Sequence, residues 1–164
     1  MTAAALALEE LLGWSDESTR QWMQFLASTP AACGLPCGIY GCATVLGLVR
    51  HIVAVELRHG ERLAGLPVTA YEEIPEDSLA ALAALHGETM QRFRELLGDS
   101  TIDWAAEIEF PTRSAVTLRA TRRKLLAHAL LHSIRHWAQL ATLLRTAGYQ
   151  PGIAGDLLAS SALS

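Results

Sequence analysis

Aromatic side chains are scarce in this sequence, where Phe, Trp and Tyr together make up 6% of 164 residues. β-branched residues are sparse as well, and Ala and Leu dominate an apolar share of 51%. Strands favour aromatic and β-branched residues whereas Ala and Leu favour helices, so this composition excludes a sheet-rich fold. We expect an all-α protein whose residues 1–164 form a single domain.

Cysteine is also rare, and the only three, Cys33, Cys37 and Cys42, share one short segment. An odd number is a poor basis for a disulfide framework, and the spacing lacks the paired CxxC of a zinc ribbon. We expect reduced thiols in a loop or at a helix start. A reactive or metal-binding cysteine is the alternative, with Cys42 closest to a helix interpreted below as part of the functional site.

Basic residues are not in excess, since the formal net charge is −4. This balance argues against a broad nucleic-acid interface, which needs clustered basic surface. The one basic run, residues 119–124, is interpreted as the solvated start of the last long helix.

Long apolar runs are missing too: none reaches the roughly 18 residues of a membrane span. Residues 1–8 lack the basic start and apolar stretch of a secretory signal, so we expect a cytoplasmic protein. Mean hydropathy is nevertheless positive, at +0.23. An apolar surface shared between two copies would explain this value, and a homodimer is therefore expected.

Four stretches have the composition and periodicity of long helices, and the predicted ranges are 4–27, 43–64, 79–97 and 121–147. Gly13 and the polar residues 15–18 are possible interruptions of the first helix. Residues 30–41, rich in Gly and Pro, form a loop by composition. Asp77 or Ser78 is the N-cap candidate of the third helix.

The remaining segments are short. Residues 102–118 alternate loosely between apolar and polar side chains around Pro111, which predicts an extended segment or small hairpin between the third and fourth helices. Gly148 ends the fourth helix, and a short helical turn is expected at residues 155–159. The long helices together predict an irregular antiparallel bundle.

Three histidines stand four residues apart in the fourth helix, at His128, His132 and His136. At about 100° per residue, His136 lies about 40° from His132, and both fall in the apolar stripe. His128 lies about 40° to the other side, near the polar border that Arg135 marks. His132 and His136 are therefore the inward pair, and His128 is a rim residue.

Buried imidazoles need a partner at each nitrogen, and a shared metal ion supplies one for each. A third ligand is expected from another helix, and His51 lies on an apolar face of the second. His51, His132 and His136 are thus the predicted metal ligands. His59 and His86, which have charged neighbours in the sequence, are expected on the surface.

The alternatives depend on the fourth coordination position. Three neutral imidazoles leave a charge of +2 on Zn²⁺ or Ni²⁺ and at least one position open to water or substrate. A further ligand from Cys42, Glu56 or His128 would close the site and favour a non-catalytic metal or small-molecule binding protein of a stress response. The third interpretation of the sequence is a structural dimer whose core histidines bind no metal.

The sequence is similar to the DinB/YfiT-like family, which is unrelated to the DNA polymerase of similar name. The similarity rests on His128-xxx-His132-xxx-His136 with Gln139 and residues 140–158, and on His51 with residues 55–67. Trp137-Ala138 stands where many relatives have Arg-Gly, and the segment Pro30 to Cys42 is unusually rich in Cys, Gly and Pro. These departures bear on the shape and entrance of the pocket.

The resemblance implies an up-down-down-up four-helix bundle, often dimeric, that holds a divalent metal through three histidines, here His51, His132 and His136. Zn or Ni is the expected ion, with Fe or Mn as alternatives. It also implies a small-molecule substrate and thiol-dependent S-transfer or isomerisation with a low-molecular-weight thiol, or hydrolysis by metal-activated water. Arg58, about 20° from His51 on the wheel, would bind a carboxylate, and Gln139 would orient a ligand or water.

Overall fold

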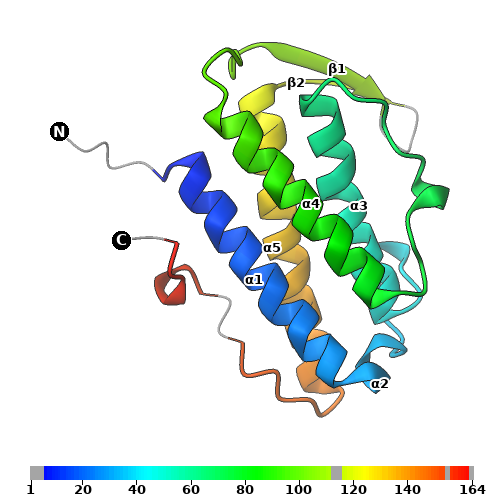
Figure 1. Cartoon of the computed structure of the whole chain (residues 1–164). Helices are drawn as coiled ribbons and strands as arrows, with labels where there is room; N and C mark the ends of the chain where they lie inside the picture. The colour runs from blue at the N-terminus through cyan, green and yellow to red at the C-terminus, as the bar shows by residue number, and fades with distance from the viewer. Residues whose placement is uncertain (1–5, 112–115, 154–155, 163–164) are drawn as a thin grey trace.

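The computed structural model describes residues 6–111, 116–153 and 156–162, and it is mostly helical. Four long helices lie side by side in Figure 1: α1 (Leu8–Ser28), α3 (Val45–Leu63), α4 (Leu79–Gly98) and α5 (Arg122–Thr146). The short helix α2 (Pro30–Cys33) follows α1, and the 3-10 turns are η1 (Ile39–Gly41), η2 (Tyr71–Glu73) and η3 (Leu157–Ala159). The predicted helix ranges are confirmed to within a few residues, apart from the predicted residues 4, 5 and 155, which lie outside the described ranges.

Local capping explains where the helices begin. The hydroxyl of Ser78 accepts a hydrogen bond from the Ala81 amide at 3.2 Å, so Ser78 rather than Asp77 caps α4. Thr44 and Thr121 cap α3 and α5 in the same way. Such caps satisfy amides that have no partner within the helix.

Helix α1 runs through the predicted interruption without a break, because its polar residues face inward and find partners. Ser15 donates to the Leu130 carbonyl at 3.4 Å, and Thr19 accepts from the indole of Trp137 at 2.8 Å. Ser15 and Thr19 are fully buried. These side chains therefore bind α1 to α5 and leave the backbone helical.

The segment between α4 and α5 forms a hairpin. Strand β1 (Glu107–Pro111) pairs antiparallel with β2 (Thr117–Thr121), and Phe110 lies opposite Leu118. Phe110 is buried and packs on the core, whereas Leu118 is exposed. The hairpin thus covers the end of the helices where α5 begins, as Figure 1 shows.

Two apolar clusters make up the core. One surrounds Trp137, which stacks on Trp22 with the ring centroids 5.9 Å apart. The other surrounds Phe93 and lies toward the hairpin. Helix α4 approaches α3 closely at Gly60, where an added Cβ would come 3.3 Å from the ring of Phe93.

A charged network crosses the interior beside these clusters. His86 is 1% exposed, so the expectation that it lies on the surface is wrong. Its Nδ1 lies 2.7 Å from Glu56 on α3, and its Nε2 lies 3.1 Å from Asp16 on α1. Arg94 and Arg20 also pair with Asp16. The charged neighbours of His86 in the sequence were misleading, because its partners come from two other helices.

The charge of His86 follows from these contacts. Burial alone would lower its pKa, but the charge of Glu56 and the hydrogen bonds to Asp16 and Glu56 outweigh burial and raise the pKa to about 9. His86 is therefore an imidazolium at neutral pH, and each nitrogen donates to a carboxylate.

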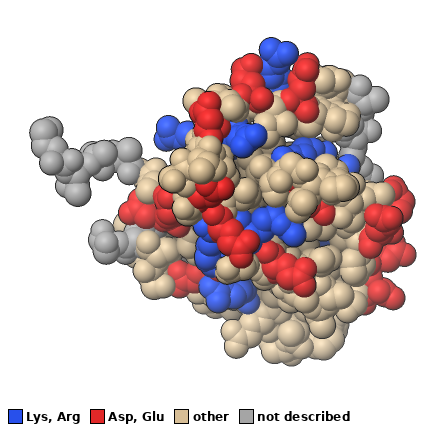
Figure 2. All heavy atoms as spheres, turned by 45° about the horizontal axis from the view of Figure 1, so that its top comes forward, with Lys and Arg blue, Asp and Glu red and all other residues tan. Residues whose placement is uncertain are grey.

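The surface carries both signs of charge. Figure 2 shows Lys and Arg side chains scattered among Asp and Glu side chains on the face it presents. Among the described residues, no helix has both the length and the apolar character needed to cross a membrane.

We predict that stability falls as pH rises from about 6.5 to about 9, because His86 keeps its proton in the folded state over this range and loses it in the unfolded state. The free energy of unfolding from urea titrations at pH 6, 7, 8 and 9 measures the effect. His86→Gln should lower that energy by roughly 3–5 kcal/mol at pH 7 and flatten its pH dependence. An equal slope in both proteins would contradict this assignment.

Candidate metal centre

Three histidines from two helices converge on one point. Nε2 of His132 lies 3.1 Å from Nε2 of His51 and 3.1 Å from Nε2 of His136. One ligand atom from each lies within 4.8 Å of the others, and all three side chains are buried. Nitrogens bound to one ion at about 2.0–2.1 Å stand roughly 2.9–3.4 Å apart at octahedral to tetrahedral angles. The two 3.1 Å separations match that spacing.

The environment favours the neutral form of two of these imidazoles. Burial, together with the neighbouring His136, His51 and Arg135, lowers the pKa of His132 to about 2. Burial and Arg135 also lower the pKa of His136. Because only a neutral imidazole has a lone pair to offer, His132 and His136 favour the form that a metal ion requires.

Gln139 orients one of the three rings. Its side-chain oxygen accepts a hydrogen bond from Nδ1 of His136 at 2.7 Å. With the proton on Nδ1, the lone pair of His136 lies on Nε2 and points toward the cluster. Nδ1 of His132 is buried and has no hydrogen-bond partner among the described residues. Among the described residues, Nδ1 of His136 therefore has a hydrogen-bond partner, whereas Nδ1 of His132 has none.

Three other candidate ligands do not join the cluster. Among the described His, Cys, Asp and Glu side chains, no fourth belongs to the group within 4.8 Å. Both oxygens of Glu56 are engaged elsewhere, by the hydroxyl of Ser133 at 2.5 Å and by His86. His128 is exposed, and its ring centroid is 5.7 Å from that of His132. Cys42 is half-buried and lines a cavity next to His51.

Tyr40 covers one side of the cluster, and the sequence analysis missed it. Its ring stacks on His51 at 4.7 Å between centroids and lies 6.1 Å from His136. Tyr40 has a φ of 52°, a left-handed conformation that favours glycine, and strain of this kind gathers at functional sites. The glycines that flank Tyr40 were the available sequence signal for this unusual backbone. Gly38 and Gly41 also have positive φ.

A cavity of about 680 Å³ adjoins this ring. Tyr40 and His51 are part of its lining, and so are Cys42, Arg50, Tyr71 and Glu76. Arg50 is held in place, because it donates to the carbonyls of Ile74 and Tyr71. The cavity is thus an open space that reaches one of the three histidines.

Arg58 lies on α3 near the cluster but is not part of it. Its Nε is buried and has no hydrogen-bond partner among the described residues, although the side chain as a whole is half-buried. His59, expected on the surface, is 9% exposed. It packs edge-on against Phe110 and His128, each with ring centroids 5.7 Å away. Phe110 belongs to the hairpin. The residues next to His59 in the sequence could not predict that the hairpin packs on it.

The tryptophan that departs from the family pattern points away from the histidines. Trp137 is 2% exposed, stacks on Trp22 and donates to Thr19, so it belongs to the contact between α5 and α1.

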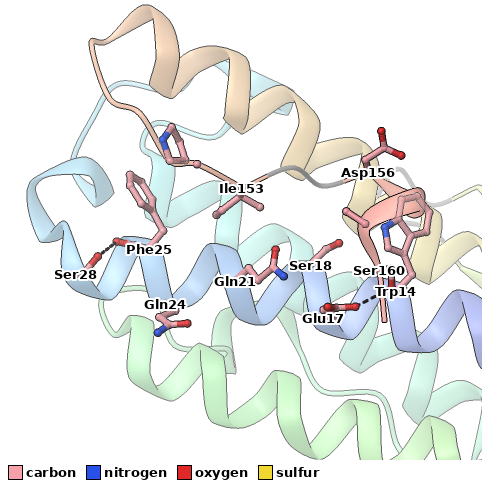
Figure 3. A pocket seen from close by; sticks show the side chains of 13 residues that line it. Trp14, Glu17, Ser18, Gln21, Gln24, Phe25, Ser28, Ile153, Asp156 and Ser160 are labelled. Carbon is pink, nitrogen blue, oxygen red and sulfur yellow. Dashed lines mark hydrogen bonds between the residues drawn. The ribbon is translucent and has the colours of Figure 1, made fainter. Parts of the chain in front are cut away.

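A second cavity, of about 540 Å³, lies between α1 and the C-terminal segment, as Figure 3 shows. Gln21, Phe25 and Ile153 are part of its lining. Glu17 accepts a hydrogen bond from the Ser160 hydroxyl at 2.7 Å, which ties the C-terminal segment to α1. None of the three histidines lines this cavity.

Comparisons with known proteins identify the family of the chain. A search of curated proteins gives no match. The model of the DinB family matches residues 1–160, which is nearly the whole chain and includes all three clustered histidines. The chain therefore belongs to the DinB family.

Proposed function

We propose that the protein binds one divalent metal ion through Nε2 of His51, His132 and His136 and uses it in catalysis. The observation that carries the proposal is the convergence of three buried Nε2 atoms, with the two contacts of His132 at 3.1 Å. Membership of the DinB family is consistent with it. The proposed substrate is a small molecule.

The chemistry proposed is metal-dependent transfer or isomerisation with a low-molecular-weight thiol, or hydrolysis by water. A bound divalent ion would supply Lewis acidity, which turns a thiol or water into a nucleophile at neutral pH. An open coordination position is what such chemistry needs. The lack of a fourth His, Cys, Asp or Glu ligand among the described residues supports it over the non-catalytic alternative.

The chain's own residues have separable roles in this proposal. Gln139 holds the tautomer of His136 through Nδ1, and Tyr40 covers the ring of His51 beside the cavity. Arg58 offers a guanidinium on the same side of α3 as His51, about two turns along the helix. We propose that Arg58 binds an anionic group of the substrate.

The proposed metal is Zn²⁺ or Ni²⁺, with Fe²⁺ and Mn²⁺ as alternatives. All three ligands are imidazole nitrogens, which suit Zn, Ni and Fe better than oxygen-preferring Mg²⁺ or Ca²⁺. Hence the oxygen-preferring ions are the least suited to the cluster.

We also propose that the long helices form an up-down-down-up bundle in one domain. Contacts along the helices support this order. His51 and His59 on α3 contact His132 and His128 in reverse sequence on α5, which is antiparallel pairing. On α4, His86 contacts Glu56 and Phe93 approaches Gly60, which is parallel pairing with α3. The homodimer and the cytoplasmic location stay predictions.

Metal analysis tests the centre directly. Protein purified without a histidine tag should carry about one equivalent of metal after exposure to Zn²⁺, Ni²⁺, Fe²⁺ or Mn²⁺. His51→Ala and His132→Ala should each weaken binding by more than about 100-fold, since even changes to residues that only hydrogen-bond to a metal ligand cost about 10–100-fold. His128→Ala is the matched control and should retain the metal. Wild-type protein that takes up only a trace of every ion would refute the proposal.

The pH at which metal is released is a second test. The pKa values of His132 and His136 are lowered in the folded protein, so protons compete weakly with a metal ion. We expect half-release below the ordinary histidine pKa of about 6.5. Elemental analysis after equilibration between pH 4 and 8 measures this midpoint, and a midpoint above 7 would contradict the expectation.

Catalysis has its own measurement. The metal-loaded protein, mixed with a panel of low-molecular-weight thiols and electrophilic acceptors, should form thioether adducts detectable by mass spectrometry. Chelation of the metal and His132→Ala should both abolish them. If the protein binds metal but forms no adduct and hydrolyses no ester or amide in a matched panel, the non-catalytic alternative is favoured.

A further inference from the structure

Two arginines lie near the three-histidine cluster, one on each of its two helices. Arg135 on α5 lies between His132 and His136 in the sequence, and its Nη2 is 3.3 Å from Nε2 of His136. Arg58 on α3 follows His51 by seven residues, which places it about 20° away on the helix and roughly 10 Å along the axis. Both side chains are long enough to reach the space beside the cluster.

No carboxylate neutralises these arginines in the part of the chain that the structure describes. The ion pairs found there use Arg20, Arg50, Arg94 and Arg119, together with His86. Neither Arg58 nor Arg135 takes part in one. Arg58 is half-buried and Arg135 is exposed, and no ion pair among the described residues balances the positive charge of either.

Neighbouring groups strengthen this positive region. Arg62, one turn beyond Arg58, is half-buried, and its guanidinium lies over the Phe110 ring at 5.1 Å from the centroid. Glu61 is adjacent in the sequence, but its two oxygens accept from the amide and hydroxyl of Thr69, at 2.9 and 2.5 Å. The Glu61 carboxylate is thus hydrogen-bonded to a loop, although its charge also acts on Arg62.

The arginines also act on a nearby buried histidine. Burial, together with the charges of Arg62, His128 and Arg58, lowers the pKa of His59 to about 3.

The buried Nε atom of Arg58 also points to a ligand. A buried N–H without an acceptor is unfavourable, and native structures rarely keep one unless a ligand or water completes it. A guanidinium presents its donors in a planar fork that matches carboxylate and phosphate oxygens. An anion is the partner that would satisfy both the donor and the charge.

We propose that Arg58 and Arg135 form an anion subsite beside the three-histidine centre, so that the substrate carries a carboxylate or phosphate group. The subsite rests on the proposed function for its role in catalysis, but anion binding is measurable without any metal. The anion would lie between α3 and α5 and hold the reacting part of the substrate toward the histidines. Arg58 and Arg135 would then set specificity by charge.

Calorimetric titration of metal-free, full-length protein with malonate and with inorganic phosphate tests the subsite. We expect saturable binding of at least one of them, and the comparison tells whether a carboxylate or a phosphate fits better. Arg58→Gln and Arg135→Gln should each weaken that binding about tenfold or more, as the loss of a charge-assisted hydrogen bond predicts. Arg135→Lys, which keeps the charge, should recover part of it.

Arg123→Gln is the matched control, because Arg123 is an exposed arginine of α5 far around the helix from His132. It should leave anion binding unchanged. Phenylglyoxal labelling read by peptide mass spectrometry gives an independent measure, since the bound anion should protect Arg58 and Arg135 but not Arg123. Binding that all three variants retain, or the absence of saturable binding, would overturn the subsite.

Metal content of the same variants separates the two proposals. Arg58→Gln and Arg135→Gln should keep the metal while losing the anion. Wild-type protein that binds malonate or phosphate but no metal would leave the subsite standing and refute the metal centre. Metal binding without anion binding would leave the metal centre standing and refute the subsite.

Discussion

The packing of α3 against α5 is the interaction on which the rest of the structure depends. It brings His51 within 3.1 Å of His132, across 81 residues of sequence, inside an interior where an imidazole without partners is costly. The same contact brings His59 to His128 and, through the hairpin, to Phe110. Everything proposed for this protein, from metal to anion, lies in the space between these two helices.

The buried polar groups divide into two sets with opposite electrostatics. His86 is held between Glu56 and Asp16, keeps its proton and ties α4 to α3 and α1. Among the described residues no carboxylate joins the three clustered histidines, and burial favours the neutral form of His132 and His136. Glu56 is on the same helix as His51, but it is hydrogen-bonded to His86. Hydrogen bonds from Ser133 and His86 engage both oxygens of this carboxylate, so it does not join the cluster.

Positive charge beside neutral nitrogens gives the proposed site its selectivity. A metal ion held by three uncharged ligands keeps its full charge, and Arg58 and Arg135 would add to the attraction for an anion. Tyr40, strained and stacked on His51, covers a different side next to the cavity of about 680 Å³. In the proposed centre, the arginines would therefore lie on the side between α3 and α5, and Tyr40 would lie on the side of the loop that precedes α3.

The sequence by itself determined the features that depend on local order. Composition and periodicity predicted four long helices and the segment that forms the hairpin, because capping and helix propensity act over a few residues. The wheel also separated His132 and His136 from His128 and selected His51, since one helix decides which side of itself is apolar.

Only the tertiary structure decided which groups meet. The burial of His86 and His59, the engagement of Glu56 and the position of Tyr40 all depend on residues far away in the chain. A charged neighbour in the sequence says little about a side chain whose partners come from other helices. The direction in which a residue points is local, but the group it points at is chosen by the packing of the whole bundle.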